Sequence, residues 1–416
     1  MKERTTQTLQ PSYMKDFRCI GGDCEHNCCA PGWRIAVDQR SYERYLRVKD
    51  GELGALLAAS IERNPAEQLK PQYYASIRLN EKGLCPFLND RMMCRLQAEM
   101  GEKYLCNVCY TYPRVTNRVD GVLERGLSLS CPEAARQALR TEGYMEFDEG
   151  LEEETGRDII ALAFRTDERI TASRPQQLFW TIRHFTVGLL QNRDYAVWER
   201  MMILGLCLEK IQGQLDQNAR LSEITQTLEE YGARARSRGY VGAMKDIPLK
   251  LAMKMTLVSK LFAKRLGMGG ADALFGEAFC SLVAHFQNAD ADEGERFSAA
   301  YLQARERSYK PFMACHEHML EHFMVNHVFL SAFPYTQDAT LFQAYMQAAI
   351  LFSIVNTMMI GLCMDGRELT EEMLLEVVHS VSFTIVHHPA YLADMARDMS
   401  AKGQDNMAYM AMLIAN

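Results

Sequence analysis

The sequence predicts a mainly α-helical protein in which a cysteine-rich N-terminal region, residues 1–150, is packed on a larger helical body, residues 151–416. Two observations lead to this fold class. Beyond residue 150, apolar residues recur at spacings of three and four, which is the period of an amphipathic helix. Before it, nine of the thirteen cysteines lie between Cys19 and Cys131. A chain of 416 residues is long enough for two such domains.

Turn-forming residues punctuate the cysteine-rich region at close intervals. They are Gly21-Gly22-Asp23, Ala30-Pro31-Gly32, Cys85-Pro86, Asn89-Asp90 and Tyr112-Pro113. Such residues favour turns because glycine reaches positive φ and proline fixes φ near −65°. Short helices are expected between the turns, for example over residues 41–57. A short strand pair is expected over residues 92–96 and 121–124.

The helical body begins with a helix-start signal. Ser173-Arg174-Pro175-Gln176 resembles a capping box with proline in the first turn. An apolar stripe at helical spacing follows, made of Leu178, Phe179, Ile182, Phe185 and Leu189. Apolar residues dominate in the same way over 201–211, 221–231, 251–266, 314–333 and 373–386. Exposed loops are expected at 234–239 and 288–294.

The charge balance and the apolar segments exclude several classes of protein. A net charge of −7 gives no reason to expect binding to nucleic acid or to an anionic membrane. The first seven residues are polar, unlike a secretory signal. The longest apolar run, 348–364, is interrupted by Ser353, Asn356 and Thr357 and is shorter than the roughly 20 residues of a spanning helix. We therefore expect a buried core helix and a cytoplasmic protein.

The clustered cysteines follow a spacing that suits metal ligands. The pattern is Cys19-x4-Cys24-x3-Cys28-Cys29, then Cys85-Pro86, Cys94, Cys106-x2-Cys109 and Cys131-Pro132. Closely spaced pairs direct two thiolates at one metal, and distant pairs complete its coordination. Gly21 and Gly22 allow the tight backbone that such a loop needs. In a reducing cytoplasm, a dense cysteine cluster indicates metal binding rather than disulfides.

The metal centre is predicted to be iron–sulfur, with zinc as the alternative. The spacing Cys106-x2-Cys109 suits either metal. Nine thiols exceed the ligands of one site, so some are spectators or a second site exists. The radical S-adenosylmethionine signature, Cys-x3-Cys-x2-Cys, is excluded because Cys24-x3-Cys28 is followed at once by Cys29. A secreted disulfide scaffold would need an export signal. Residues 1–150 are therefore predicted to be a metal-cluster region.

Other conspicuous residues are expected to serve packing or chain reversal. Four single cysteines lie in apolar stripes and behave as small hydrophobic residues: Cys207, Cys280, Cys315 and Cys363. His318 and His322 share a helix face, but no third metal ligand is evident near them. His387-His388, before Pro389, marks a helix end. The glycines at 267–270 follow a helical stretch rather than a strand, so we expect a helix-terminating loop there and not a nucleotide-binding loop.

Several runs of residues are distinctive beyond their spacing. In the first part they are Tyr13-Met14-Lys15-Asp16-Phe17-Arg18-Cys19-Ile20-Gly21, Cys24-x3-Cys28-Cys29 with Gly32-Trp33, Cys85-Pro86-Phe87-Leu88, Tyr104-Leu105-Cys106-x2-Cys109-x-Thr111-Tyr112-Pro113-Arg114 and Leu127-Ser128-Leu129-Ser130-Cys131-Pro132. In the second part they are Leu320-Glu321-His322-Phe323 and Phe333-Pro334-Tyr335. In these segments the chain resembles the flagellin lysine-N-methylases of the FliB type, from about residue 11 to at least 335. His322 stands where the family pattern has asparagine, which matters if that side chain contacts substrate.

The resemblance implies S-adenosylmethionine-dependent methylation of lysine ε-amines, with flagellin as the protein partner. It is compatible with a cysteine-held centre, expected to be [4Fe-4S]. The candidate metal ligands are Cys19, Cys24, Cys28, Cys29, Cys85, Cys94, Cys109 and Cys131. The cysteine core also resembles a wider group of zinc- or iron-chelating proteins that open with Cys-x2-Cys-x2-Cys-Cys. Cys106 is the least expected ligand, because that group lacks a cysteine at the matching place.

The chemistry of lysine methylation requires a deprotonated amine, since an ammonium has no lone pair. A poorly hydrated pocket would lower the pKa of the lysine toward that state. Candidates to line it, from their places near the cysteines, are Tyr110, Tyr112, Glu124 and Glu133. No glycine loop of the usual methyltransferase kind follows a strand, so the methyl-donor site is expected to be unconventional and the catalytic residues stay unassigned. Two other classes remain open: an iron–sulfur redox or electron-transfer protein, and a zinc-stapled helical interaction protein without catalysis.

Overall fold

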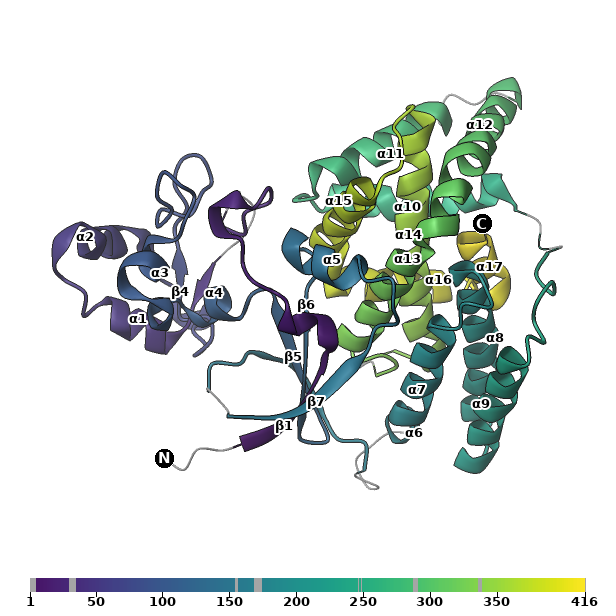
Figure 1. Cartoon of the computed structure of the whole chain (residues 1–416), viewed down its shortest axis with the longest axis horizontal. Helices are drawn as coiled ribbons and strands as arrows, with labels where there is room; N and C mark the ends of the chain where they lie inside the picture. The colour runs from purple at the N-terminus through teal and green to yellow at the C-terminus, as the bar shows by residue number, and fades with distance from the viewer. Residues whose placement is uncertain are drawn as a thin grey trace. The chain divides into compact units, whose positions relative to one another are not determined.

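A computed structural model of the chain describes residues 5–29, 35–153, 156–167, 174–245, 247, 249–286, 291–335 and 339–415 (Figure 1). Helices account for 58% of the structure and strands for 11%, which confirms the mainly α fold class. The chain divides into two compact units. The first comprises residues 1–134 and 147–163, and the second comprises residues 135–146 and 164–416. The predicted division between residues 150 and 151 falls inside strand β7, Phe147–Glu153.

A five-stranded sheet organises much of the first unit, in the order β7-β1-β6-β5-β8. Its strands are β1 Thr5–Pro11, β5 Arg114–Val119, β6 Val122–Leu127, β7 and β8 Ile160–Phe164. β1 runs antiparallel to β7, with Thr5 opposite Glu153, and parallel to β6, with Thr8 opposite Leu123. Residues at the two ends of this unit's sequence thus lie beside each other in one sheet.

The predicted strand pair is half right. Residues 122–124 do lie in β6, but their partner is β5 and not residues 92–96. β5 and β6 are joined by Asp120 and Gly121, both at positive φ, which is the geometry of a tight hairpin turn. Residues 92–96 instead leave a turn held by Asn89, whose side-chain oxygen accepts from the backbone N–H groups of residues 91 and 93. They then enter a short helix, α3 Arg95–Met100.

A smaller three-stranded sheet and short helices complete the first unit. The strands are β2 Ala36–Val37, β4 Ala75–Ile77 and β3 Ile61–Arg63, in that order. The helices are α1 Gln39–Tyr45, α2 Gly51–Ser60, α3, α4 Asn107–Thr111 and the start of α5 Pro132–Leu139. The single helix expected over 41–57 is therefore two helices. α1 ends at Tyr45, residues 46–50 form a turn, and Gly51 opens α2 at a φ of +76°.

The second unit is a stack of helices. They are α6 Arg174–Gln177, α7 Phe179–Leu190, α8 Val197–Asp216, α9 Leu221–Arg236, α10 Leu251–Gly267, α11 Ala273–Phe286, α12 Ala291–Ala304, α13 Lys310–Leu330, α14 Leu341–Met364, α15 Glu371–Val381, α16 Pro389–Ser400 and α17 Met407–Ile414. Short π-helical turns extend two of them, at Arg305–Tyr309 and Ser382–Val386. These bounds match the predicted apolar stripes.

Helix α14 forms the centre of this unit (Figure 1). It packs against α8, α11, α16 and α17 among others. Its length and apolar composition would suit a membrane span, but 94% of its most apolar stretch is buried inside the protein, as in the core helix of a globular fold. This confirms the buried core helix that the run at 348–364 predicts. Close packing also explains Gly205 on α8, where a Cβ atom would lie 2.4 Å from the side chains of Tyr345 and Met407.

The loop predictions have mixed outcomes. Gly269 and Gly270 follow α10 at positive φ, which confirms a helix-terminating loop. The loop expected at 288–294 is wrong in its second part, because residues 291–294 form the first turn of α12. Residues 234–236 likewise still belong to α9. Ser173 of the predicted capping box, residues 288–290, the turn at 30–32 and Trp33 lie outside the described residues.

Candidate functional site

The nine clustered cysteines all belong to the first unit and interact electrostatically in two linked groups. One group, Cys29, Cys85, Cys94, Cys106 and Cys109, packs against a hydrophobic core that includes Val37, Tyr45, Phe87 and Leu96. The other contains Cys19, Cys24, Cys28 and Cys131. A side-chain contact between Cys28 and Cys29 joins the two groups.

Hydrogen bonds between thiols divide these cysteines into donors and acceptors. The bond from Cys29 lowers the pKa of Cys28 to about 7 and also lowers the pKa of Cys85. The bond from Cys109 lowers the pKa of Cys106 in the same way. The donors change in the opposite direction, since giving up their proton breaks the bond, and the pKa of Cys29 and of Cys109 is raised. These contacts bring the sulfurs of Cys28, Cys29 and Cys85, and those of Cys106 and Cys109, close together.

Backbone N–H groups also point at the sulfurs, which favours the thiolate form. Sulfurs that accept such bonds, with the donating residues, are Cys24 from His26, Cys85 from Phe87, Cys94 from Leu96 and Gln97, Cys106 from Cys109, and Cys131 from Glu133 and Ala134. The donor lies two or three residues after each sulfur. Burial opposes this effect and raises the pKa of Cys131 to about 12.

Close backbone contacts hold the cysteine loops together. Gly21 has a φ of +60°, and a Cβ atom on Gly22 would lie 2.1 Å from the carbonyl oxygen of Arg91. Gly22 also donates its N–H to the Met93 sulfur at 3.1 Å. The backbone N–H of Cys85 donates to the carbonyl oxygen of Cys29 at 3.0 Å. Glycine at 21 and 22 is thus required by the approach of two loops, as the sequence suggested.

The donor chemistry fits a thiolate-held centre: nine sulfurs in one unit, hydrogen-bonded in pairs and contacted by backbone N–H groups. Within the described ranges, however, no three His, Cys, Asp or Glu side chains stand together in a set able to hold a metal ion. The ligand set stays a prediction. Cys106 is 1% exposed and contacts Cys109. Cys19, in contrast, is exposed at the edge of its group.

Two tyrosines of the predicted lysine pocket, Tyr112 and Tyr110, lie near the sulfurs. Tyr112 donates to or accepts from Ser130 at 3.1 Å, and its pKa is raised by burial and by the neighbouring Cys131, Cys28 and Cys24. Tyr110 lies under the guanidinium of Arg157, 3.6 Å from the ring centre.

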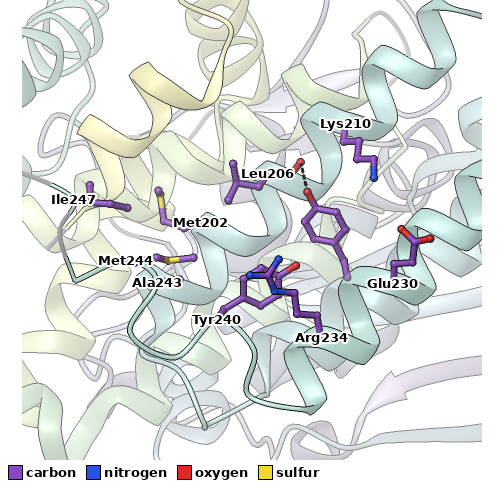
Figure 2. A pocket seen from close by; sticks show the side chains of 10 residues that line it. Met202, Leu206, Lys210, Glu230, Arg234, Tyr240, Ala243, Met244 and Ile247 are labelled. Carbon is purple, nitrogen blue, oxygen red and sulfur yellow. Dashed lines mark hydrogen bonds between the residues drawn. The ribbon is translucent and has the colours of Figure 1, made fainter.

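A cavity of about 580 Å³ does open in the second unit, between α8, α9 and the segment that follows α9 (Figure 2). Its lining residues are Met202, Leu206, Lys210, Glu230, Tyr231, Arg234, Tyr240, Ala243, Met244 and Ile247. In Figure 2 the methionines and Ile247 lie at one end, and Lys210 and Glu230 lie at the other. This site was not predicted from the sequence, although Glu230, Tyr231 and Arg234 lie at spacings of three and four on one helix.

The two tyrosines of the pocket are held in place and stay neutral. Their rings are stacked, with centroids 6.1 Å apart. The backbone N–H of Tyr240 donates to the hydroxyl of Tyr195 at 3.4 Å, and that hydroxyl donates to the carbonyl oxygen of Ala235 at 3.0 Å. Burial raises the pKa of Tyr240 to about 12 and also raises the pKa of Tyr231. Neither phenol is therefore a base at physiological pH.

The histidines of α13 serve packing, as expected. Both ring nitrogens of His322 lie 2.9 Å from carbonyl oxygens, those of Ala138 and Gly143, so neither is available to a metal. The neighbouring Glu321 is 1% exposed and accepts from Arg200 at 2.6 Å and from Arg193 at 2.9 Å. This buried ion-pair network was not predicted. An acidic residue inside an apolar stripe was the signal for it.

The prediction for the four single cysteines is wrong for two of them. Cys207 and Cys363 are buried, but Cys280 and Cys315 are exposed. The physical reason is the helical period: Cys315 lies two positions after the buried Met313, which places it about 200° around the helix axis. His387 lies just past the π-helical turn and Pro389 begins α16, which confirms the predicted helix end.

Comparisons with known proteins place this second unit in context. The sequence model described as "FliB lysine N-methylase C-terminal domain" matches residues 183–413, more than half of the chain. Curated relatives include the "Flagellar biosynthetic protein FliU" of Salmonella muenchen and a "Lysine-N-methylase" from each of Salmonella choleraesuis and Salmonella typhimurium. Each is 29% identical over 153 residues, 36% of this chain. The match spans 85% of the first relative and 36% of each methylase. No solved structure matches the chain.

Proposed function

The chain belongs to the FliB lysine N-methylase family, and we propose on this ground that it transfers the methyl group of S-adenosylmethionine to lysine ε-amines of flagellin. The observation that carries the proposal is the family match, which covers nearly all of the second unit. The names of the relatives, two lysine-N-methylases and one flagellar biosynthetic protein, support the substrate class. Action on flagellin before its export would locate the protein in the cytoplasm.

The reaction forms a bond between the lysine nitrogen and the methyl carbon while the sulfur–methyl bond breaks. The sulfonium takes up that electron pair and leaves as a neutral thioether, S-adenosylhomocysteine. The amine must first lose its proton to water or a base, because only the free amine carries a lone pair. Enclosure of the target lysine at a poorly hydrated surface would promote this loss by lowering the lysine pKa.

We further propose that the clustered cysteines of the first unit hold an iron–sulfur centre, with zinc as the alternative. The side-chain contacts that join Cys28, Cys29 and Cys85, and those between Cys106 and Cys109, support this, because thiolates are the ligands of both metals. When bound, such a centre would cross-link the loops around Gly22 and Met93 and supply a Lewis-acidic or redox-active atom. The candidate ligands are Cys19, Cys24, Cys28, Cys29, Cys85, Cys94, Cys109 and Cys131, with Cys106 the least expected.

The test is methyl transfer by the purified, metal-replete protein. Flagellin from the same organism is incubated with S-adenosylmethionine, and methylated lysines are identified by mass spectrometry, with lysine-acetylated flagellin as the control. Methylation of native flagellin alone is the expected result. Bound iron without any methyl transfer would favour the redox or electron-transfer alternative. Bound zinc without methyl transfer would favour the helical interaction protein.

A further inference from the structure

The pocket of the second unit combines an apolar end, a pair of tyrosines and a charged rim. We infer that it is the binding site of the methyl donor, S-adenosylmethionine. This inference rests on the proposed function, which requires such a donor. The sequence has no glycine loop after a strand, which is the usual donor site of methyltransferases. This pocket would be the unconventional donor site that we expect in its place.

The size and place of the pocket suit a small ligand. A volume of about 580 Å³ lies within the range of small-molecule sites, roughly 300–1,000 Å³. All of its lining residues fall between Met202 and Ile247, inside the region that matches the family. The walls are pre-formed, because the side chains of Met202, Tyr240 and Met244 are buried in the helical unit.

The inner part of the pocket suits the adenosine group. Met202, Met244 and Ile247 line one end with aliphatic and thioether groups (Figure 2). A purine ring has flat apolar faces that pack well against such side chains and against tyrosine rings.

The rim of the pocket suits an amino-acid tail, which carries one carboxylate and one ammonium. Lys210 and Arg234 offer two positive charges for the carboxylate, and Glu230 offers one negative charge for the ammonium. The guanidinium of Arg234 is fixed, since it lies 4.4 Å from the centre of the Tyr240 ring and its Nε donates to the carbonyl oxygen of Gly239 at 3.3 Å. Among the described residues, no carboxylate forms an ion pair with Lys210 or Arg234.

The same charges argue against the other reactant in this pocket. A lysine side chain enters as an ammonium, and Lys210 and Arg234 would repel it at the rim. Glu230 alone opposes that repulsion, whereas the methyl donor also brings a carboxylate that pairs with one of the two cations. The pocket is therefore assigned to the donor, and flagellin must approach from outside it.

Equilibrium binding of S-adenosylmethionine and S-adenosylhomocysteine to the full metal-replete chain tests the assignment. The variants are Arg234→Met, which removes a rim charge, and Ala243→Trp, which fills the exposed side of the pocket. The matched control is Arg236→Met, an exposed arginine on the same helix that does not line the pocket. We expect each pocket variant to weaken binding at least tenfold and the control to stay within twofold, with circular dichroism and metal content unchanged.

The outcomes separate this assignment from the proposed function. If the wild type methylates flagellin while both pocket variants bind the donor normally, the donor lies elsewhere and the inference is overturned although the enzyme stands. If flagellin, and not S-adenosylhomocysteine, protects Lys210 from amine-reactive labelling, the pocket belongs to the substrate. If the wild type neither binds the donor nor methylates flagellin, both proposals fall together. If circular dichroism shows that Arg234→Met or Ala243→Trp is unfolded, the remaining variant, at a different wall of the pocket, still tests the assignment.

Discussion

Cys29 and Cys109 carry the side-chain contacts that connect the clustered sulfurs. Cys29 bonds to Cys28 and Cys85, and Cys109 bonds to Cys106. In the metal-free protein, the proton in each of these bonds lies between two sulfurs and keeps both from being charged at once. A metal would replace those protons, so uptake of metal should release them and depend on pH.

Replacing Cys109 or Cys28 by serine should remove metal. A serine hydroxyl is a far weaker ligand for iron or zinc than a thiolate, and each residue sits inside one of the linked groups. We expect bound iron or zinc, measured by elemental analysis, to fall by more than half. Cys315→Ser is the matched control, because that thiol is exposed and single. Full metal retention in both variants would remove these sulfurs from the ligand set.

Gly22→Ala should disturb the loop between Cys19 and Cys24. The new Cβ atom would lie 2.1 Å from the Arg91 carbonyl oxygen, and backbone cannot give way cheaply. We expect the free energy of unfolding to fall by about 1–3 kcal/mol. Gly213→Ala on α8, where nothing lies within 4 Å, is the control and should be neutral or slightly stabilising. Equal stability of the two variants, in denaturant titrations, would contradict the close contact of the loops.

The lowered pKa of the buried Lys254 should make the stability of the protein depend on pH. Burial lowers its pKa to about 7 from an ordinary value of 10.5. Between pH 7 and 10.5 the lysine is protonated in the unfolded chain but neutral in the folded protein. The free energy of unfolding therefore rises with pH over this range, by up to about 1.4 kcal/mol per pH unit, and falls again as the pH is lowered.

The Lys254→Met variant should lose this rise, while Lys260→Met, at an exposed position of the same helix, should keep it. Denaturant unfolding at pH 7, 8 and 9 gives the comparison. If the free energies of unfolding of the wild type and Lys254→Met change with pH in the same way, Lys254 is charged and hydrated in the folded protein.

At the scale of elements, α13 is fixed to its neighbours by one buried acid. Glu321 accepts from Arg200 on α8 and from Arg193 in the turn before it, and both Glu321 and Arg200 are almost fully buried. Arg200 also donates to the carbonyl oxygens of Tyr195 and Leu190. The network therefore joins α13, α8 and the end of α7.

Glu321→Ala should destabilise the second unit by about 3–5 kcal/mol, since it leaves a buried guanidinium without its partner. Glu372→Ala is the control: this glutamate pairs with Arg140, but its side chain is 70% exposed. Exposed pairs contribute about 0–1 kcal/mol. Thermal and denaturant unfolding of the two variants measures the difference, and an equal effect would mean that the buried pair is weak.

The helices were predictable from sequence, whereas the five-stranded sheet was not. α9 shows its buried face in the sequence at spacings of three and four, and α14, buried on all sides, shows itself as a long apolar run. β1 and β7 carry few apolar residues, and their pairing joins Thr5 to Glu153. Such a contact depends on the path of the whole intervening chain, so no local pattern reveals it. The Asp120-Gly121 turn was the one local signal for its hairpin.

The candidate site was predictable only in part, for the same reason. The spacing of cysteines indicated which residues belong together, and the structure does bring Cys29, Cys85 and Cys109 into one electrostatic group. It did not indicate which thiols donate and which accept, because that depends on distances across loops. The pocket around Tyr240 was missed because its walls come from two helices and a following segment.

At the scale of the whole molecule, the chain combines a unit rich in thiols with a helical unit of the FliB family. The account assigns metal binding to the first and methyl-donor binding to the second. If catalysis needs both, loss of either should abolish methyl transfer while the other binding activity persists. Arg234→Met should therefore keep its metal, and Cys109→Ser should keep a folded helical unit.

The most direct test is the rate of lysine methylation on flagellin, measured by mass spectrometry alongside metal content for the wild type, Cys109→Ser and Cys315→Ser. The account predicts methylated lysine with the wild type and with Cys315→Ser. It predicts that methylation and metal are lost together in Cys109→Ser. A metal-replete wild type that transfers no methyl group from S-adenosylmethionine to flagellin would contradict the proposed function. A Cys109→Ser variant that loses its metal and still methylates at the wild-type rate would contradict the role of the cysteines.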